Sequence, residues 1–230
     1  MTLHFSPASK APSREAEEAL VVFNGFSLDP LCFEHLGHET LDLFICGNYS
    51  QLDLPQELLT LAGRYKRVSV VAYSLGVWVW SQVEEVLNLP PGGRIMVNGT
   101  CEPLHPRLGI PPRIFRLTLE NFTLEGREQF YRNLSGSPEI HTRLEKCLPR
   151  RTWEDQRSEL ESLWYSISQY PSRRVTPNLA IISTQDRIIP PGNQKSYWEP
   201  RSPVLTLDSG HFPFFHWDSW EEILDAGKHE

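Results

Sequence analysis

The feature that most constrains the fold of this chain is a serine placed between an apolar strand and an apolar helix. Residues 67–71 read Arg-Val-Ser-Val-Val, a buried-strand pattern, and an apolar helix pattern runs from Leu75 to Leu87. Between them lies Ala72-Tyr73-Ser74-Leu75-Gly76, with a small residue two positions before and after the serine. A sharp turn of this kind needs small neighbours, and it presents the serine hydroxyl above a sheet as a potential nucleophile.

Two further residues follow later strand patterns in the order that a serine hydrolase requires. Asp186 comes shortly after the strand pattern at 178–183, and His211 comes shortly after the last one, at 202–207. Because ligands of open α/β sheets bind at the carboxyl ends of the strands, these residues are predicted to meet Ser74 there. The order Ser, Asp, His is that of the α/β-hydrolases, so we predict Ser74 as nucleophile, His211 as base and Asp186 as acid.

Each member of this triad has a competing interpretation. Ser74 also fits an ordinary turn serine, and Asp186 fits the cap of a helix predicted to begin near Pro190. Asp208 and Asp218 are alternative acids. Five other histidines compete for the role of base, namely His35, His38, His105, His141 and His216. We prefer His211 because it follows the final strand, within a Gly-His-Phe turn.

Strand and helix patterns alternate along most of the chain, which predicts a mostly parallel sheet flanked by helices. Strand patterns cover residues 19–23, 41–46, 67–71, 94–98, 178–183 and 202–207, and a first helix pattern covers 55–62. Residues 103–174 instead carry helix patterns at 124–134, 138–146 and 153–170. We therefore predict an α/β-hydrolase fold with a core of residues 1–102 and 175–230 and a helical lid insertion at 103–174. The first 18 residues are predicted to be an irregular lead into the first strand.

The predicted chemistry also needs backbone N–H groups that stabilise a developing oxyanion. One donor is predicted at Leu75, directly after the nucleophile. The second is predicted in the loop Asn24-Gly25-Phe26-Ser27-Leu28-Asp29 after the first strand, with Phe26 as the donor. An ordinary Asn-Gly turn is the competing interpretation of this loop. Neither a metal nor an organic cofactor is required by this chemistry.

Charge is divided unevenly between the two predicted parts. The chain has 22 basic and 29 acidic residues, whereas residues 103–174 hold 12 basic and nine acidic ones, which leaves 10 and 20 for the core. The arginines of this segment form either a solvated surface or docking points for an acidic partner. The candidates for docking are Arg107, Arg113, Arg116, Arg150, Arg151, Arg173 and Arg174. The overall acidity argues against a nucleic-acid-binding protein.

Composition excludes several other classes of protein. A hydrophobic content of 40% and an aromatic content of 11% exclude a mainly disordered chain. No run of about 18 apolar residues predicts a membrane span, and the first residues lack the apolar stretch of a secretory signal. The four cysteines form no C-x-x-C pair and no cluster with metal-ligand spacing, which is typical of a reducing cytoplasm.

Several short segments, spread over most of the chain beyond residue 20, form a recognisable combination. They are Phe23–Asp29, Ala72–Trp78, Asn98–Thr100, Phe130–Arg132, Asp186–Gln194, Tyr197–Trp198 and Ser209–Phe214. Together they resemble the BioG-type pimeloyl-acyl-carrier-protein (pimeloyl-ACP) methyl ester esterases of bacterial biotin synthesis. Phe26-Ser27 departs from the Trp-Gly-type pair of that family, a change in side chains that leaves the backbone role open to Phe26.

The resemblance implies an enzyme that cleaves the methyl ester of pimeloyl-ACP, with Ser74, Asp186 and His211 in the roles given above. Acyl carrier protein is strongly acidic, so it matches the arginine-rich segment as a partner. A general short-acyl carboxylesterase or a thioesterase with the same triad is an alternative. A non-catalytic binding protein built on the same fold is a second alternative.

Overall fold

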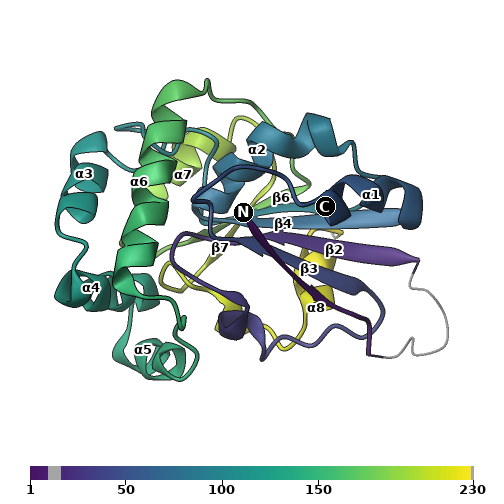
Figure 1. Ribbon diagram of the computed structural model, residues 1–230, viewed down its shortest axis with the longest axis horizontal. Helices are drawn as coiled ribbons and strands as arrows, with labels where there is room; N and C mark the ends of the chain where they lie inside the picture. The colour runs from purple at the N-terminus through teal and green to yellow at the C-terminus, as the bar shows by residue number, and fades with distance from the viewer. Residues whose placement is uncertain (10–16, 229–230) are drawn as a thin grey trace.

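A seven-stranded sheet forms the centre of the computed structural model, which describes residues 1–9 and 17–228 (Figure 1). The strands are β1 (Thr2–Ser6), β2 (Glu18–Phe23), β3 (Asp42–Gly47), β4 (Arg67–Tyr73), β5 (Arg94–Val97), β6 (Leu179–Ser183) and β7 (Val204–Leu207). Their order across the sheet is β1-β3-β2-β4-β5-β6-β7. Strand β1 is antiparallel to β3, and all other neighbours are parallel.

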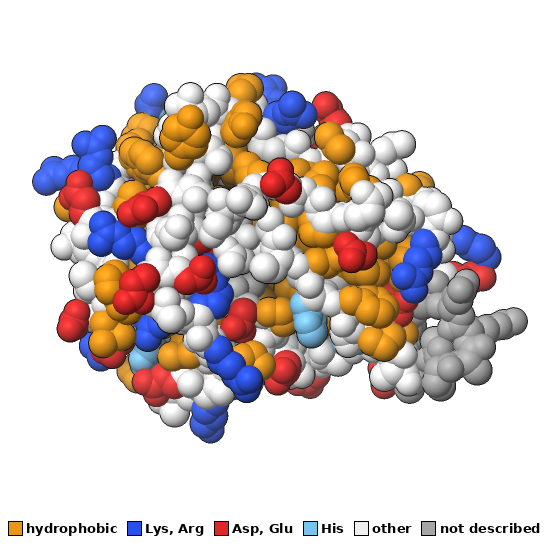
Figure 2. All heavy atoms as spheres, viewed as in Figure 1, with side chains coloured by type: hydrophobic (Ala, Val, Ile, Leu, Met, Phe, Trp, Pro, Cys, Tyr) orange, Lys and Arg blue, Asp and Glu red, His pale blue; other side chains and the backbone are white. Residues whose placement is uncertain are grey.

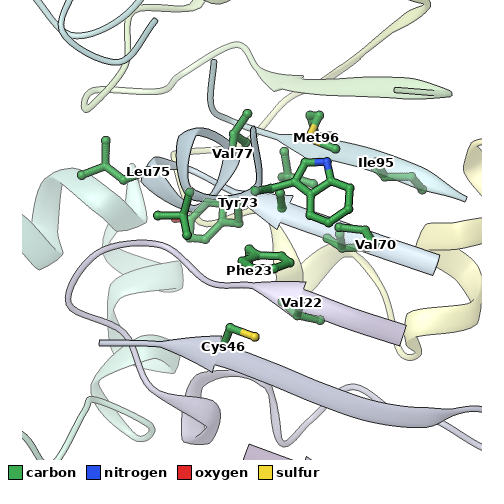
Figure 3. Packing of buried hydrophobic residues seen from close by; sticks show 14 of the residues in the cluster. Val22, Phe23, Cys46, Val70, Tyr73, Leu75, Val77, Ile95 and Met96 are labelled. Atoms are coloured by element: carbon green, nitrogen blue, oxygen red, sulfur yellow. The ribbon is translucent and has the colours of Figure 1, made fainter. Parts of the chain in front are cut away.

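Helices cover both faces of this sheet, which explains why its central strands are apolar along almost their whole length. Figure 1 shows α1 (Gln56–Arg64) and α2 (Leu75–Leu87) over one face and α8 (Trp220–Ala226) against the other. Helix α7 (Pro191–Trp198) packs near β6. Labelled side chains of β2, β4, β5 and the first turn of α2 gather in one buried cluster (Figure 3).

A group of four helices is inserted between β5 and β6 and lies beyond one end of the sheet, at the left of Figure 1. These helices are α3 (Pro112–Glu120), α4 (Leu124–Ser135), α5 (Pro138–Glu145) and α6 (Trp153–Gln169). Side chains of Thr123, Ser137 and Thr152 cap the last three by accepting hydrogen bonds from backbone N–H groups of the first turn. The predicted α/β-hydrolase fold with a helical insertion is confirmed. The boundaries 103–174 remain our own division of the chain, and we call this segment the lid.

Two elements differ from the predictions. Residues 2–6 form β1 rather than an irregular lead, because they pair with the open edge of β3, from Thr2 opposite Gly47 to Ser6 opposite Leu43. Residues 10–16 of the predicted lead lie outside the described residues. Helix α3 was not predicted because Pro111 and Pro112 suggest a break, although Pro112 is its first residue, a position where proline is favoured.

Three short elements complete the fold and were not predicted from the sequence. They are α8 and two 3₁₀ helices, η1 (Pro30–Phe33) and η2 (Phe214–His216). Phe33, Phe214 and Trp220 bring these elements together through ring contacts with centroids 5.0–5.8 Å apart. None of the helices in the described part of the chain is long and apolar enough to span a membrane.

The close packing of α2 under β2 generates a first prediction. A Cβ atom at Gly76 would lie 2.2 Å from the carbonyl oxygen of Phe23 and 2.4 Å from that of Asn24, both backbone atoms. We expect Gly76→Ala to lower the free energy of unfolding by about 1–3 kcal/mol or more, since the backbone must move to relieve the overlap.

Urea denaturation measures this change, and Gly63→Ala is the matched control. Gly63 lies in α1, and a Cβ there meets no atom within 4 Å. Alanine is the better helix former, so the control should keep or raise the stability. Equal stability of the two variants would contradict the close packing described at Gly76.

Candidate active site

Ser74 lies at the turn that joins β4 to α2, with φ 56° and ψ −126°. Positive φ is rare for a residue with a side chain, and such strain persists only where the surrounding structure holds the backbone in place. Gly76 allows the start of α2 to approach the end of β2, and Gly25 allows the neighbouring loop to pass close to Tyr73. The turn therefore places the Ser74 hydroxyl at the carboxyl edge of the sheet.

The three predicted triad residues lie within hydrogen-bonding distance of one another. The Nε2 atom of His211 is 2.8 Å from the Oγ of Ser74, and its Nδ1 atom is 2.6 Å from the Oδ2 of Asp186. All three side chains are buried. A proton can pass from the serine hydroxyl to an imidazole whose other nitrogen is held by a carboxylate, the arrangement that activates a serine nucleophile.

Further contacts hold this relay in position. The Oδ1 atom of Asp186 accepts hydrogen bonds from the backbone N–H groups of Ile188 and Ile189, at 2.8 and 2.9 Å. The Oδ2 atom accepts from Gln194 at 2.8 Å as well as facing His211. Asp186 therefore also closes a turn through Oδ1, but it does not cap α7, whose N-cap residue is Pro190 and has no side-chain cap bond.

Asn98 fixes the loop that carries His211. It follows β5, its backbone has φ 45°, and its side-chain amide donates 2.8 Å hydrogen bonds to the carbonyl oxygen of His211 and to the Oγ of Ser183. Its side-chain oxygen also accepts from the Ser183 N–H at 2.7 Å. The ends of β5 and β6 and the histidine loop are thereby joined through one amide.

Competing residues have partners elsewhere. His35 faces the carbonyl oxygen of Phe214 at 3.0 Å, and burial lowers the pKa of its imidazole. His38 faces Ser6 at 3.0 Å. Asp208 is exposed and accepts from Gln185 at 2.6 Å. These contacts account for the three side chains without Ser74.

A cavity of about 290 Å³ opens above Ser74, between the core and the lid. Ligand-binding cavities of proteins begin at about this size and are mostly apolar. The wall includes apolar side chains of α3, α4 and α6, together with residues of the Phe26 and Ile188 loops. The lining side chains of apolar character are Phe26, Leu75, Ile110, Ile114, Phe115, Leu117, Phe130, Leu160 and Ile188. Among the described residues that line it, Arg187 alone carries a charge.

The two predicted oxyanion donors border this cavity together with Ser74. Leu75 is the first residue of α2, where backbone N–H groups have no acceptor within the helix. The N–H of Phe26 donates no hydrogen bond to any of the residues that the structure describes. Both groups are therefore available to an oxygen atom held beside Ser74. Ser27, which follows Phe26, has φ 75°, a conformation that favours glycine.

A buried ion pair lies behind this loop, and it corrects one prediction. The side chain of Arg151 is only 14% exposed, and it contacts Asp155 at 2.5 Å and Glu159 at 2.6 Å. Glu159 is fully buried; burial raises the pKa of its carboxyl, and the neighbouring Arg151 opposes that shift. Arg151 therefore holds a buried carboxylate and is not a free docking point.

The other six arginines of the prediction are exposed, but they do not form one patch. Arg113 and Arg116 lie on α3, and Arg107 precedes that helix. Arg150 and Arg173 lie before and after α6, a helix of 17 residues and hence about 25 Å long. Arg173 contacts Glu85 at 3.2 Å. Figure 2 shows basic, acidic and hydrophobic side chains intermingled over the lid.

Several polar residues of this site received no role from the sequence, although three of them lie in segments that carry the resemblance. Asn98, Gln194, Gln156, Glu159 and Tyr131 are buried and hydrogen-bonded around the predicted triad and the Phe26 loop. A helix pattern assigns Gln156, Glu159 and Gln194 to the solvent face, so it gives no reason to select them. Within the described residues, no group of three His, Cys, Asp or Glu side chains is arranged to hold a metal ion.

Comparison with solved structures places the fold in the α/β-hydrolase class. An enol-lactonase from Burkholderia xenovorans superimposes with a TM-score of 0.65 at 14% identity, covering 98% of this chain and 94% of that one. A thermophilic esterase from Thermogutta terrifontis gives 0.65 at 16% identity, covering 98% and 91%. At these identities the likeness defines the fold.

The family is defined more narrowly by two other comparisons. The family model described as pimeloyl-ACP methyl esterase BioG matches residues 8–223. BioG from Haemophilus influenzae superimposes with a TM-score of 0.87 at 30% identity, covering 98% of this chain and 100% of that one. The chain belongs to the BioG family and is therefore a hydrolase.

One curated relative is much longer than this chain and is named for a different activity. The malonyl-[acyl-carrier protein] O-methyltransferase of Bacteroides fragilis is 35% identical over 197 residues, which cover 85% of this chain. The chain spans only 40% of the length of that relative. An uncharacterized protein of Haemophilus influenzae is 32% identical over 216 residues, with 92% and 96% covered.

The buried pair of Arg151 and Glu159 generates a second prediction. Arg151→Ala leaves Glu159 buried without its cation, so we expect the free energy of unfolding to fall by about 3 kcal/mol. Its neighbour Arg150 is exposed, and Arg150→Ala should change the stability by less than about 0.5 kcal/mol. Thermal unfolding of the two variants gives the comparison, and equal losses would refute the role of Arg151.

Proposed function

We propose that this chain is a serine carboxylesterase that hydrolyses the methyl ester of pimeloyl-ACP and so frees the pimeloyl carboxylate for biotin synthesis. The observation that carries the proposal is the relay from Asp186 through His211 to Ser74, which opens onto an apolar cavity in a member of the BioG family. Ser74 is the nucleophile, His211 the base and Asp186 the acid that orients the imidazole.

Acylation is the first half of the proposed reaction. His211 Nε2 takes the hydroxyl proton as the Oγ of Ser74 attacks the ester carbonyl carbon. The carbonyl oxygen becomes an oxyanion that accepts hydrogen bonds from the N–H groups of Phe26 and Leu75. Each such donor typically lowers the barrier by about 3 kcal/mol. The carbon–oxygen bond to the methoxy group then breaks, the imidazolium returns its proton, methanol leaves, and the acyl group remains on Ser74.

Deacylation completes the cycle with a water molecule. His211 takes a proton from the water as its oxygen attacks the acyl carbon, and the same two N–H groups stabilise the second oxyanion. Cleavage of the bond to the Oγ of Ser74 then gives the proton back to the serine and releases the carboxylic acid, which ionises in water. Asp186 stabilises the imidazolium in both halves, since its carboxylate is 2.6 Å from Nδ1.

Two observations support a carrier-bound methyl ester as the substrate. The cavity wall is apolar and suits an alkyl chain that reaches Ser74 between the lid helices. The relative from Bacteroides fragilis is named for methylating malonyl groups on acyl carrier protein. Methylation of a carrier-bound dicarboxylate makes an ester of the kind that the family description says is cleaved.

We infer that the carrier protein docks at α3. Ile114 and Leu117 of this helix line the cavity and are also 49% and 43% exposed, so α3 forms part of its mouth. Arg113 and Arg116 are exposed on the same helix, where they attract an acidic partner. Docking there brings an acyl group directly to the cavity, whereas the arginines at the two ends of α6 are separated by the whole length of that helix.

The proposed nucleophile gives a third prediction. We expect Ser74→Ala to fold normally and to lose ester hydrolysis by roughly 10⁴-fold or more, because the serine supplies the attacking oxygen. Turnover of pimeloyl-ACP methyl ester and of a short aryl ester measures the loss, and circular dichroism checks the fold.

A second buried serine provides the matched control for this variant. Ser81 lies in the same helix, α2, and its Oγ donates to the carbonyl oxygen of Trp78. Ser81→Ala should keep its activity. If Ser74→Ala turns over the esters as fast as wild type, the triad is rejected. If folded wild-type protein hydrolyses neither ester, the non-catalytic alternative is favoured.

The docking surface gives a fourth prediction. The double variant Arg113→Glu/Arg116→Glu should raise the KM for pimeloyl-ACP methyl ester by about tenfold, because it reverses the charge that faces an acidic carrier. The KM for a free short-chain aryl ester should stay unchanged. The matched double variant Arg173→Glu/Arg174→Glu, in the exposed segment after α6, should have a smaller effect. An equal change for both substrates would point instead to damage of the cavity and to a general carboxylesterase.

A further inference from the structure

A buried polar cluster joins the lid to the loop that carries the proposed oxyanion donor. Its members are Tyr131 of α4, Gln156 and Glu159 of α6, and Ser27, which directly follows Phe26 in the loop. All four side chains are almost completely buried. The triad does not use them, and burial of so many polar groups is costly unless each contact has a purpose.

Every hydrogen-bonding group of Ser27 is held by a lid residue. Its hydroxyl lies 2.7 Å from the Tyr131 hydroxyl, and its carbonyl oxygen accepts from the Nε2 atom of Gln156 at 3.0 Å. Its N–H points to Glu159 at 3.4 Å. Gln156 also donates to the Tyr131 hydroxyl at 2.8 Å, so the two lid helices hold one another as well as the loop.

Glu159 also holds the loop that follows β3. Its Oε1 atom accepts from the N–H of Tyr49, in the loop after β3, at 3.0 Å. The hydroxyl of Tyr49 donates to the carbonyl oxygen of Asn24 at 2.9 Å, at the start of the Phe26 loop. Residues on both sides of Phe26 are thus tied to lid helix α6, Ser27 directly and Asn24 through Tyr49.

We propose that Tyr131, Gln156 and Glu159 are positioning residues for the oxyanion hole, so that the lid sets the catalytic geometry of the core. This inference rests on the proposed function, in which the N–H of Phe26 is an oxyanion donor. The peptide between Phe26 and Ser27 is planar, so holding Ser27 fixes the position of the Phe26 Cα atom. Tyr49 holds the carbonyl oxygen of Asn24 on the other side, so the N–H of Phe26 lies between two anchored points.

The backbone conformation of Ser27 explains why these hydrogen bonds are needed. Its φ of 75° is unfavourable for a residue with a side chain, and the loop relaxes toward ordinary values once its contacts are removed. An oxyanion donor works only when it is aimed in advance at the position that the negative charge will occupy. A displacement of about 1 Å is enough to lower a rate by about 100-fold.

The experiment compares variants that remove one polar contact each and keep the volume of the side chain. Tyr131→Phe removes the hydroxyl, and Gln156→Met removes the amide. We expect kcat for a short aryl ester to fall about tenfold or more in each variant, with KM within about twofold of wild type. Binding of a trifluoromethyl ketone, which forms a tetrahedral oxyanion on Ser74, should weaken by the same factor as kcat.

A double variant tests the contact itself. Ser27→Ala removes the other half of the bond to Tyr131, so Ser27→Ala/Tyr131→Phe should be no slower than the slower of the two single variants. Multiplied losses in the double variant would overturn the inference, because they would mean that the two hydroxyl groups act separately.

Tyr65→Phe is the matched control for loss of a buried tyrosine hydroxyl. Tyr65 donates to the Oδ2 of Asp42 at 2.7 Å, at the opposite end of the sheet from Ser74. We expect it to lose stability as Tyr131→Phe does and to keep its kcat. Titration with a fluorophosphonate counts the active sites, so that kcat can be given per active site. If Tyr131→Phe loses stability but keeps this kcat, the cluster is only structural and the inference is wrong.

The assay keeps this inference separate from the proposed function. A free aryl ester needs no carrier protein, so an error in the proposed substrate does not affect the comparison. Unchanged activity of Ser74→Ala would reject the triad itself. An inactive Ser74→Ala together with full kcat in Tyr131→Phe and Gln156→Met would keep the triad and reject the positioning role.

Discussion

The contact on which the site depends is the approach of two backbones where α2 begins beneath the end of β2. Gly76 lies so close to the carbonyl oxygens of Phe23 and Asn24 that no side chain fits between them. This packing holds the turn at Ser74 in its positive φ and brings it beside the Phe26 loop. A wider separation would leave the nucleophile and the proposed oxyanion donors on different parts of the surface.

Buried hydrogen bonds and one ion pair then hold the residues on both sides of this turn in place. The carboxyl of Asp186 divides its oxygens between a backbone turn and His211, and Gln194 supports the oxygen that faces the imidazole. On the other side, Glu159 is buried with three donors around it, and Arg151 supplies the compensating charge. Buried charges of this kind are retained where their geometry is specific, and here they join the lid to the loops of the core.

Much of this arrangement was predictable because it depends on local patterns and on one topological rule. Ser74, Asp186 and His211 each follow an apolar strand, and parallel strands end at one edge of the sheet. Strand β1 was not predicted because it is short, has no buried residue and gains its stability from pairing with β3. The role of Arg151 was misjudged because the sequence shows two charged residues eight positions apart but not that they pair and are buried.

The sequence by itself determined the class of fold, the order of six strands and of the longer helices except α3, and which three residues meet at the carboxyl edge. Apolar periodicity and the small residues around Ser74 carry that information locally. Only the tertiary structure decided that α3 lines the cavity, that Arg151 faces inward, and that Tyr131 and Gln156 hold Ser27. The two contacts of Ser27 join residues more than 100 positions apart. The energies of all these contacts depend on distance and burial, which no local pattern of residues encodes.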